Sequence, residues 1–226
     1  MSDIGANLER VRERIARAAE RSGHRGDDVL LIGVSKTVEV ERIQQAVAAG
    51  VPALGENRVQ EAKEKVAALG RPVPWHLIGH LQTNKVREAL ELFALVHSLD
   101  RLDLATELDR RARQRGRAVA VLVQVNVGGE SNKGGFAPDA VPSALDAIAK
   151  LDHIHVRGLM TIPPIAERAE DARGWFRALA QLGKRVGLAE LSMGMSADFE
   201  VAIEEGATMV RVGTAIFGPR PAKATP

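Results

Sequence analysis

The spacing of hydrophobic residues changes regularly along the chain, from the period of a helix to that of a buried strand and back. Residues 4–21 carry apolar side chains three or four positions apart, with Arg and Glu between them, which predicts an amphipathic helix. Residues 28–35 are almost continuously apolar, which is typical of a strand buried on both faces. Lys36 follows this run directly, at the carboxyl end of the first predicted strand.

The same alternation continues through the rest of the chain and predicts eight strands in all. Strands are expected at residues 28–35, 52–54, 75–78, 94–98, 118–127, 154–159, 189–192 and 209–212. Helices are expected at residues 4–21, 40–49, 58–69, 102–114, 140–150, 170–182 and 197–205. Repeated strand–helix units of this kind predict an α/β fold, a (β/α)8 TIM-type barrel with an extra N-terminal helix outside the ring.

An open, doubly wound sheet is the alternative arrangement of such units. A dinucleotide-binding sheet of that type has a GxGxxG turn after its first strand, and residues 33–37, GVSKT, lack it. Neither a linker rich in Pro, Gly or Ser nor a shift in composition divides the chain. We therefore expect residues 1–226 to form a single barrel domain.

Composition narrows the classes of function. The 226 residues are 45% hydrophobic and 27% charged, as in an ordinary soluble protein, and no apolar run is long enough to span a membrane, so a cytoplasmic location is expected. The absence of cysteine excludes disulfides, thiolate metal sites and a cysteine nucleophile. The 31 basic and 29 acidic residues are interleaved and aromatic residues are 3%, which disfavours nucleic acid and membrane surfaces as partners.

Polar residues and glycines follow most of the predicted strands, where barrels of this class carry their functional groups. The segments after the last two strands contain Ser196, Gly213 and Thr214, which offer a hydroxyl and backbone N–H groups, and a helix is expected to begin near residues 196–198. Hydroxyls, small residues and a helix N-terminus are the usual components of a phosphate site. The pattern predicts a phosphorylated ligand.

Lys36 can supply the reactive group for such a ligand. A lysine at the mouth of a barrel is pushed toward its neutral form by desolvation and by neighbouring cations, and a neutral amine attacks aldehydes to form a Schiff base. The position alone favours an exposed loop lysine, because most lysines are solvated. The surrounding motifs decide between these interpretations.

Six ordered motifs along nearly the whole chain resemble the pyridoxal-phosphate homeostasis protein family. They are GVSKT at 33–37, GENRVQE at 55–61, WHLIG at 75–79 with LQTNK at 81–85, GLM at 158–160, LSMGMS at 191–196 and RVGTAIFG at 211–218. The resemblance implies a barrel similar to the N-terminal domain of alanine racemase, with pyridoxal 5'-phosphate (PLP) as the cofactor. It also implies a role in intracellular PLP and vitamin B6 homeostasis without robust catalytic turnover.

The resemblance also implies roles for individual residues. Lys36 would carry the cofactor as a Schiff base, Ser196, Gly213 and Thr214 would hold its phosphate, Arg211 would face the pyridine nitrogen and Asn57 would line the ring pocket. Met160 and Met195 would pack near the cofactor. The partners implied are PLP and apo-forms of PLP-dependent enzymes, and we expect a monomer.

A PLP-dependent, racemase-like enzyme is the alternative function. Racemisation needs acid–base groups on both faces of the substrate, and the chain contains no tyrosine to serve opposite the lysine, so His80 or a water would have to take that part. An arginine beside the ring nitrogen makes the ring a poorer electron sink. No catalytic residue is therefore assigned. A sugar-phosphate aldolase also uses a barrel lysine, but usually on a later strand.

Metal and hydrolase sites are not expected. His76 and His80 have the i,i+4 spacing of a helical metal pair, but they lie where a strand runs into a turn, which separates them. His153 and His155 share a strand face without a third ligand. The chain has neither a GxSxG motif nor a phosphate-binding P-loop motif.

Overall fold

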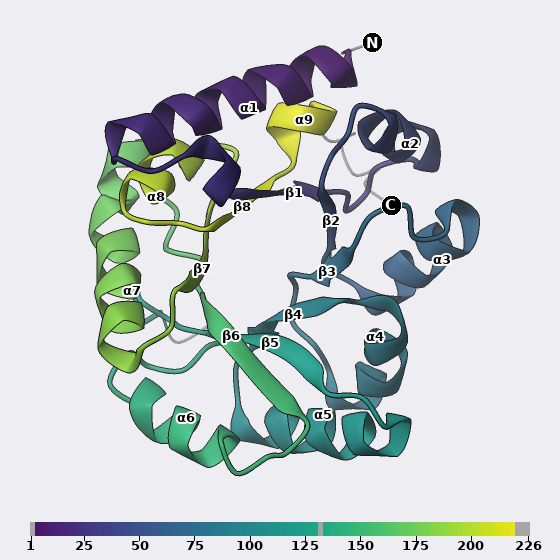
Figure 1. The fold of residues 1–226 in the computed structure, drawn as a ribbon, viewed down its shortest axis with the longest axis vertical. Coiled ribbons are helices and arrows are strands. Elements are labelled where there is room, and N and C mark those ends of the chain that lie inside the picture. Colours follow the sequence, from purple (N-terminus) through teal and green to yellow (C-terminus); the bar gives the residue numbers. More distant parts are fainter. Residues whose placement is uncertain (1–2, 131–132, 220–226) are drawn as a thin grey trace, which may run out of the picture.

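Within residues 3–130 and 133–219, which the computed structural model describes, eight parallel strands close into a ring in chain order (Figure 1). Each strand pairs with the next, and β8 pairs with β1 through Leu30–Met209 and the three following residue pairs. The strands are β1 (Leu30–Val34), β2 (Ala53–Glu56), β3 (Trp75–Leu77), β4 (Leu95–Leu99), β5 (Val119–Gln124), β6 (Ile154–Met160), β7 (Glu190–Met195) and β8 (Met209–Val212).

Helices surround this ring on the outside (Figure 1). The α-helices are α1 (Ile4–Arg21), α2 (Val40–Ala48), α3 (Val59–Leu69), α4 (Val86–Leu92), α5 (Leu102–Arg115), α6 (Val141–Ile148), α7 (Arg173–Val186), α8 (Phe199–Glu204) and α9 (Thr214–Phe217). Short 3-10 turns are η1 (Gly26–Asp28), η2 (Thr83–Lys85) and η3 (Ala169–Ala172). Helix α1 precedes the first strand and packs against α8, α9 and α2, so the predicted TIM-type barrel with an extra N-terminal helix is confirmed.

Several elements differ from the sequence-based expectation. Helix α4 was not predicted, because its seven residues are too few for a helical period to stand out. Strand β7 runs on to Met195, beyond the predicted end at Ser192, and it includes Gly194 at φ 89°. A side chain at Gly194 would lie 2.6 Å from the Ala202 Cβ, so this position needs glycine although the strand continues. The helix expected at 170–182 begins as the 3-10 turn η3 and becomes α-helical only at Arg173.

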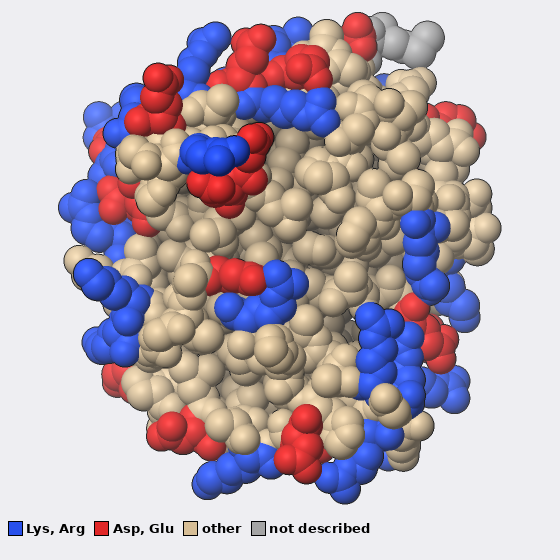
Figure 2. All heavy atoms as spheres, viewed as in Figure 1, with Lys and Arg blue, Asp and Glu red and all other residues tan. Residues whose placement is uncertain are grey.

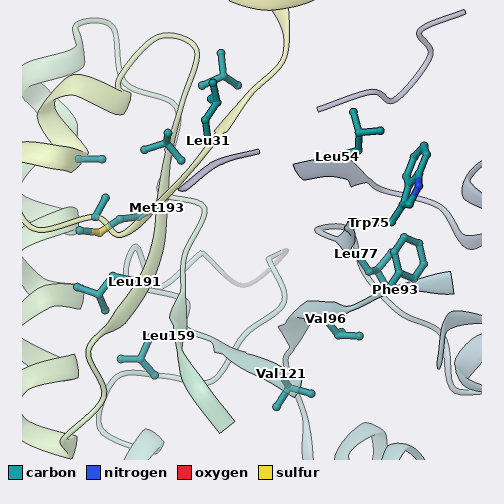
Figure 3. Close-up of a cluster of buried hydrophobic side chains, with 14 of the residues drawn as sticks. Leu31, Leu54, Trp75, Leu77, Phe93, Val96, Val121, Leu159, Leu191 and Met193 are labelled. Carbon is teal, nitrogen blue, oxygen red and sulfur yellow. The ribbon is translucent and has the colours of Figure 1, made fainter. Parts of the chain in front are cut away.

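The hydrophobic core has two layers because side chains on a strand alternate between its faces. The outer layer lies between strands and helices, and Figure 3 shows Trp75, Leu191 and Met193 on the helix-facing side of their strands. The inner layer fills part of the barrel interior. It consists of Ile32, Ala53, Leu95, Leu122, Met160 and Met209.

The surface carries charges of both signs. On the face shown in Figure 2, acidic and basic side chains are interspersed around the periphery. In the described ranges 3–130 and 133–219, none of the helices combines the length and the apolar character that a membrane crossing requires.

Candidate functional site

A cavity of about 780 Å³ opens at the carboxyl ends of the strands. Its wall includes all six residues predicted to bind the cofactor, namely Lys36, Asn57, Ser196, Arg211, Gly213 and Thr214. The other lining residues are Val34, Ile78, Gly79, His80, Asp100, Gln124, Val125, Asn126, Lys133, Gly134, Ile162, Met195 and Ala197. Residues far apart in the sequence therefore meet in one place because the barrel gathers its strand ends there.

The segment that carries Lys36 is fixed on both sides. Before it, the Ser35 backbone N–H donates to the Gly55 carbonyl oxygen at 3.0 Å, which continues the pairing with β2. After it, Thr37 has φ 61°, a left-handed conformation that costs a residue with a side chain about 1–2 kcal/mol. The Thr37 N–H donates to Glu61 Oε1 at 2.6 Å, which offsets part of that cost. The backbone on both sides of Lys36 is thus held in place.

An ion-pair cluster formed by the buried Glu56 and Lys65 and the partly exposed Glu61 supports this segment. The Lys65 ammonium donates to Ser35 O at 2.6 Å and to Glu56 Oε1 and Glu61 Oε1 at 2.7 Å each. All three of its N–H groups therefore have acceptors, so Lys65 does not compete with Lys36 as an amine. The sequence analysis missed this role, because Glu61 and Lys65 have the i,i+4 spacing of an ordinary surface pair.

The pKa values of the two carboxylates in this cluster shift in opposite directions. Burial raises the pKa of Glu56 above its usual value, and the hydrogen bonds from Lys65 and Ser35 oppose that rise. Burial also acts on Glu61, but the hydrogen bonds from Lys65 and the Thr37 N–H outweigh it and hold the pKa of Glu61 below its usual value. The positive charge of Lys65 consequently offsets the cost of burying the Glu56 carboxylate.

Ser196 and the start of α9 form the predicted phosphate end of the cavity. The Ser196 Oγ accepts hydrogen bonds from the backbone N–H of Gly213 at 3.1 Å and of Ala215 at 3.4 Å. One part of the prediction was wrong: the helix expected from residue 197 begins only at Phe199. The helix start that meets Ser196 is that of α9, which the sequence analysis did not predict.

Arg211 is a buried cation on the cavity wall. Its Nη1 donates to Ser192 Oγ at 2.6 Å and its Nη2 donates to the Thr161 carbonyl oxygen at 2.8 Å. Burial lowers the pKa of Arg211 to about 10, and the Asp198 carboxylate opposes this shift. The guanidinium therefore stays charged at neutral pH and has a fixed orientation.

Asn57 owes its position to a close approach of two backbones. The Asn57 N–H donates to Glu56 Oε2 at 3.2 Å. A Cβ on Gly79 would lie 2.3 Å from the Asn57 carbonyl oxygen and 2.7 Å from its Cα, so only glycine fits there.

Gly79→Ala is expected to push Asn57 out of place, because that contact is with backbone and cannot be relieved by a rotamer change. We expect a loss of about 1–3 kcal/mol in the free energy of unfolding, measured by urea denaturation, the usual cost of overpacking. The matched control is Gly174→Ala in α7, where nothing lies within 4 Å of an added Cβ. Equal stability of the two variants would show that the contact at Gly79 is tolerated.

The opposite wall of the cavity carries an acid–base pair. His80 Nδ1 lies 2.8 Å from Asp100 Oδ2, and the Arg101 guanidinium donates to Asp100 Oδ1 at 2.6 Å. The Asp100 side chain is buried, whereas that of His80 is 60% exposed. The sequence analysis did not find the partner of His80, because Asp100 follows a different strand.

His76 and His80 face different partners in the structure. His76 faces His97 in the barrel interior, and His80 faces Asp100. Over the ranges 3–130 and 133–219, no group of three or more His, Cys, Asp or Glu could hold a metal ion.

The chemistry of the wall fits a phosphorylated aldehyde. Its residues include three basic ones, Lys36, Lys133 and Arg211, and one acidic one, Asp100, so basic residues outnumber acidic residues on the wall. At Ser196 an oxygen atom already accepts from two backbone N–H groups, which is the environment that a phosphate oxygen requires. Met195 lines the cavity, whereas Met160 lies in the inner apolar layer.

Comparison with known proteins gives a consistent result. Residues 6–221 match the family model for the N-terminal domain of alanine racemase. The pyridoxal phosphate homeostasis protein of Aquifex aeolicus is 48% identical over 220 residues, 94% of this chain and 96% of that protein. The homologue of the same name from Pseudomonas aeruginosa is 44% identical, with 97% of each chain covered.

A solved structure extends the similarity to three dimensions. The structure of PipY of Synechococcus elongatus with PLP bound superposes with a TM-score of 0.81 at 37% identity. The superposition covers 95% of this chain and 100% of that one.

Proposed function

The chain belongs to the pyridoxal phosphate homeostasis protein family, and on that premise we propose that it binds PLP at Lys36 and holds the cofactor without turning over a substrate. The observation that carries this proposal is the meeting of Lys36, the Ser196–Gly213 contact and the buried Arg211 on one cavity wall. In this role the protein takes part in PLP and vitamin B6 homeostasis.

Each residue of the site has a part in holding the cofactor. PLP supplies an aldehyde that condenses with a neutral amine to a Schiff base, with loss of water. Lys36 provides that amine, Ser196, Gly213 and Thr214 hold the phosphate, Arg211 meets the pyridine nitrogen and Asn57 lines the ring pocket. The backbone anchors at Ser35 and Thr37 keep the Lys36 segment in place, so little conformational entropy is lost when the cofactor binds.

The positive charge of Arg211 is the main reason to propose that the protein does not catalyse a reaction. A permanently charged guanidinium at the ring nitrogen disfavours protonation of that nitrogen, and an unprotonated ring stabilises a carbanion poorly. The chain also has no tyrosine for proton transfer.

A racemase-like activity is the second candidate, and one observation favours it. His80 lies on the cavity wall with its Nδ1 held by the buried Asp100 carboxylate, which is how a histidine is oriented for proton transfer. This pair could take the place of the missing tyrosine.

The two candidates differ in whether an amino acid loses its α-proton. We expect the PLP-loaded protein, incubated with L-alanine in D2O, to show no more α-proton exchange by NMR than its His80→Gln variant. We also expect it to restore activity to the apo-form of a PLP-dependent aminotransferase. Exchange that is rapid in the wild type and lost in His80→Gln would favour the enzyme.

The recipients and the assembly state are part of the proposal. We propose that a monomer in the cytoplasm passes PLP to apo-forms of PLP-dependent enzymes. The large hydrophobic side chains exposed in the described part of the chain are few, Leu102, Ile162, Ile165 and Met195, which supports a monomer. Light scattering after size-exclusion chromatography tests it.

A further inference from the structure

A chain of hydrogen-bonded polar side chains crosses the interior of the barrel. Arg211 Nη1 lies 2.6 Å from Ser192 Oγ, Ser192 Oγ lies 2.9 Å from His97 Nδ1, and His97 Nε2 lies 3.0 Å from His76 Nδ1. These residues come from β8, β7, β4 and β3. Strands β4 and β7 are not neighbours in the ring, so the contact between His97 and Ser192 spans the interior.

These four hydrogen-bonded side chains are buried among apolar side chains. His97 and Ser192 are 0% exposed, and Arg211 and His76 are 3% and 6% exposed. Barrel interiors of this class are mostly filled by branched apolar residues, as in the inner layer here. A polar group buried in such surroundings is costly unless it is paired, so the geometry of the four-residue chain is closely constrained.

The donors and acceptors available on these side chains determine the direction of the hydrogen bonds. Arginine only donates, so Ser192 Oγ accepts from Arg211 and has one hydrogen of its own to give. If that hydrogen goes to His97 Nδ1, then His97 carries its proton on Nε2 and donates to His76 Nδ1. In the reverse order Ser192 would accept from both neighbours, and the positive ends of the imidazole dipoles would face the guanidinium.

Burial favours the neutral form of both imidazoles. Burial lowers the pKa of His76 to about 4, with a further contribution from the positive charge of Arg157. Burial holds the pKa of His97 well below its usual value, and His76, Arg211 and Arg157 act in the same direction. A neutral imidazole has one donor and one acceptor, which is what the place of His97 between Ser192 and His76 requires.

We propose that Ser192, His97 and His76 form a buried relay of positioning residues that fixes the Arg211 guanidinium on the cavity wall, with both histidines protonated on Nε2. The assignment of that wall to PLP rests on the proposed function. The relay would give Arg211 a fixed hydrogen-bond acceptor on the side away from the cavity, so its remaining N–H groups keep one orientation toward a ligand.

The first test is independent of the cofactor. In the full chain labelled with 15N-histidine, long-range 1H–15N correlation spectra should show His76 and His97 as neutral Nε2–H tautomers between pH 6 and 8. The His76→Gln and His97→Asn variants assign their signals among the six histidines. A charged ring or an Nδ1–H tautomer at His97 would overturn the relay.

The second test follows Arg211 itself, again without PLP. Hydrogen exchange of its guanidinium N–H groups should be faster in His97→Leu and in Ser192→Ala than in the wild type. It should stay slow in His97→Asn, whose Oδ1 can take the place of Nδ1 as acceptor for Ser192. His155→Leu is the control, because His155 is exposed on β6. Equal exchange in all folded variants contradicts the proposal.

The third test uses the cofactor. The dissociation constant for PLP should rise about tenfold in His97→Leu and Ser192→Ala, the usual effect of disrupting one buried hydrogen bond, with little change in His97→Asn. The visible absorption maximum of bound PLP should shift in the same two variants. Unchanged binding and absorption in those variants, with urea midpoints showing them folded, would also overturn the relay. Failure of the wild type to bind PLP would refute the proposed function but not the first two results.

Discussion

Replacing Lys36 by methionine is expected to weaken PLP binding roughly a hundredfold, equal to about 2.7 kcal/mol, because the covalent bond can no longer form. Methionine keeps an unbranched side chain of similar length and removes only the amine. The backbone on both sides of this position is anchored through Ser35 and Thr37, so the barrel should remain folded. Titration with PLP, followed by visible absorption, measures the effect.

Lys63→Met is the matched control for this substitution. Lys63 is an exposed lysine on α3, so its replacement should leave the dissociation constant and the absorption spectrum unchanged. If Lys36→Met bound PLP like Lys63→Met, with the same spectrum, the site proposed here would be in the wrong place.

Lys65→Met is expected to destabilise the protein by about 3–5 kcal/mol, the usual cost of leaving a buried charge without its partner. The Glu56 side chain is completely buried, and Lys65 donates both to it and to the carbonyl oxygen of Ser35. The substitution therefore removes the counter-charge and releases the segment before Lys36. Urea denaturation at pH 7 measures the stability, and PLP titration measures the effect on the site.

The pH dependence of this variant has a definite sign. Burial raises the pKa of Glu56, and loss of Lys65 removes a hydrogen bond and an attraction that oppose the rise. The penalty is full above the folded-state pKa of Glu56, and it should shrink as the pH falls below that value, because a protonated carboxyl carries no charge. Adding Glu56→Gln to Lys65→Met should restore part of the stability at pH 7. A penalty that is independent of pH and not relieved in the double variant would argue against a charge effect.

The repeated strands and the positions of Lys36, Ser196 and Arg211 were accessible from the sequence, because each depends on local pattern. Buried strands show as short apolar runs, and functional residues in a barrel follow the strand ends. Motifs far apart in the chain, such as those around Lys36 and Gly213, could therefore be assigned to one face before their contact was known.

The partners of these residues were not accessible in the same way. Whether Lys65 is a surface lysine or a buried cation depends on how α3 packs against the end of β1, which its i,i+4 spacing to Glu61 does not show. The contact between His97 and Ser192 depends on the closure of the ring, because β4 and β7 are not neighbouring strands. The short helix α9, which meets Ser196, has too few residues for a periodic signal.

The central claim is that Lys36 is the attachment point of PLP, and reduction of the PLP-loaded protein by sodium borohydride followed by peptide mass mapping tests it most directly. The reduced bond is stable to digestion, so the modified lysine can be identified. We expect one pyridoxyl group per chain, on the peptide that contains Lys36. A pyridoxyl group on another lysine of the cavity, such as Lys133, with Lys36 unmodified, would contradict the account.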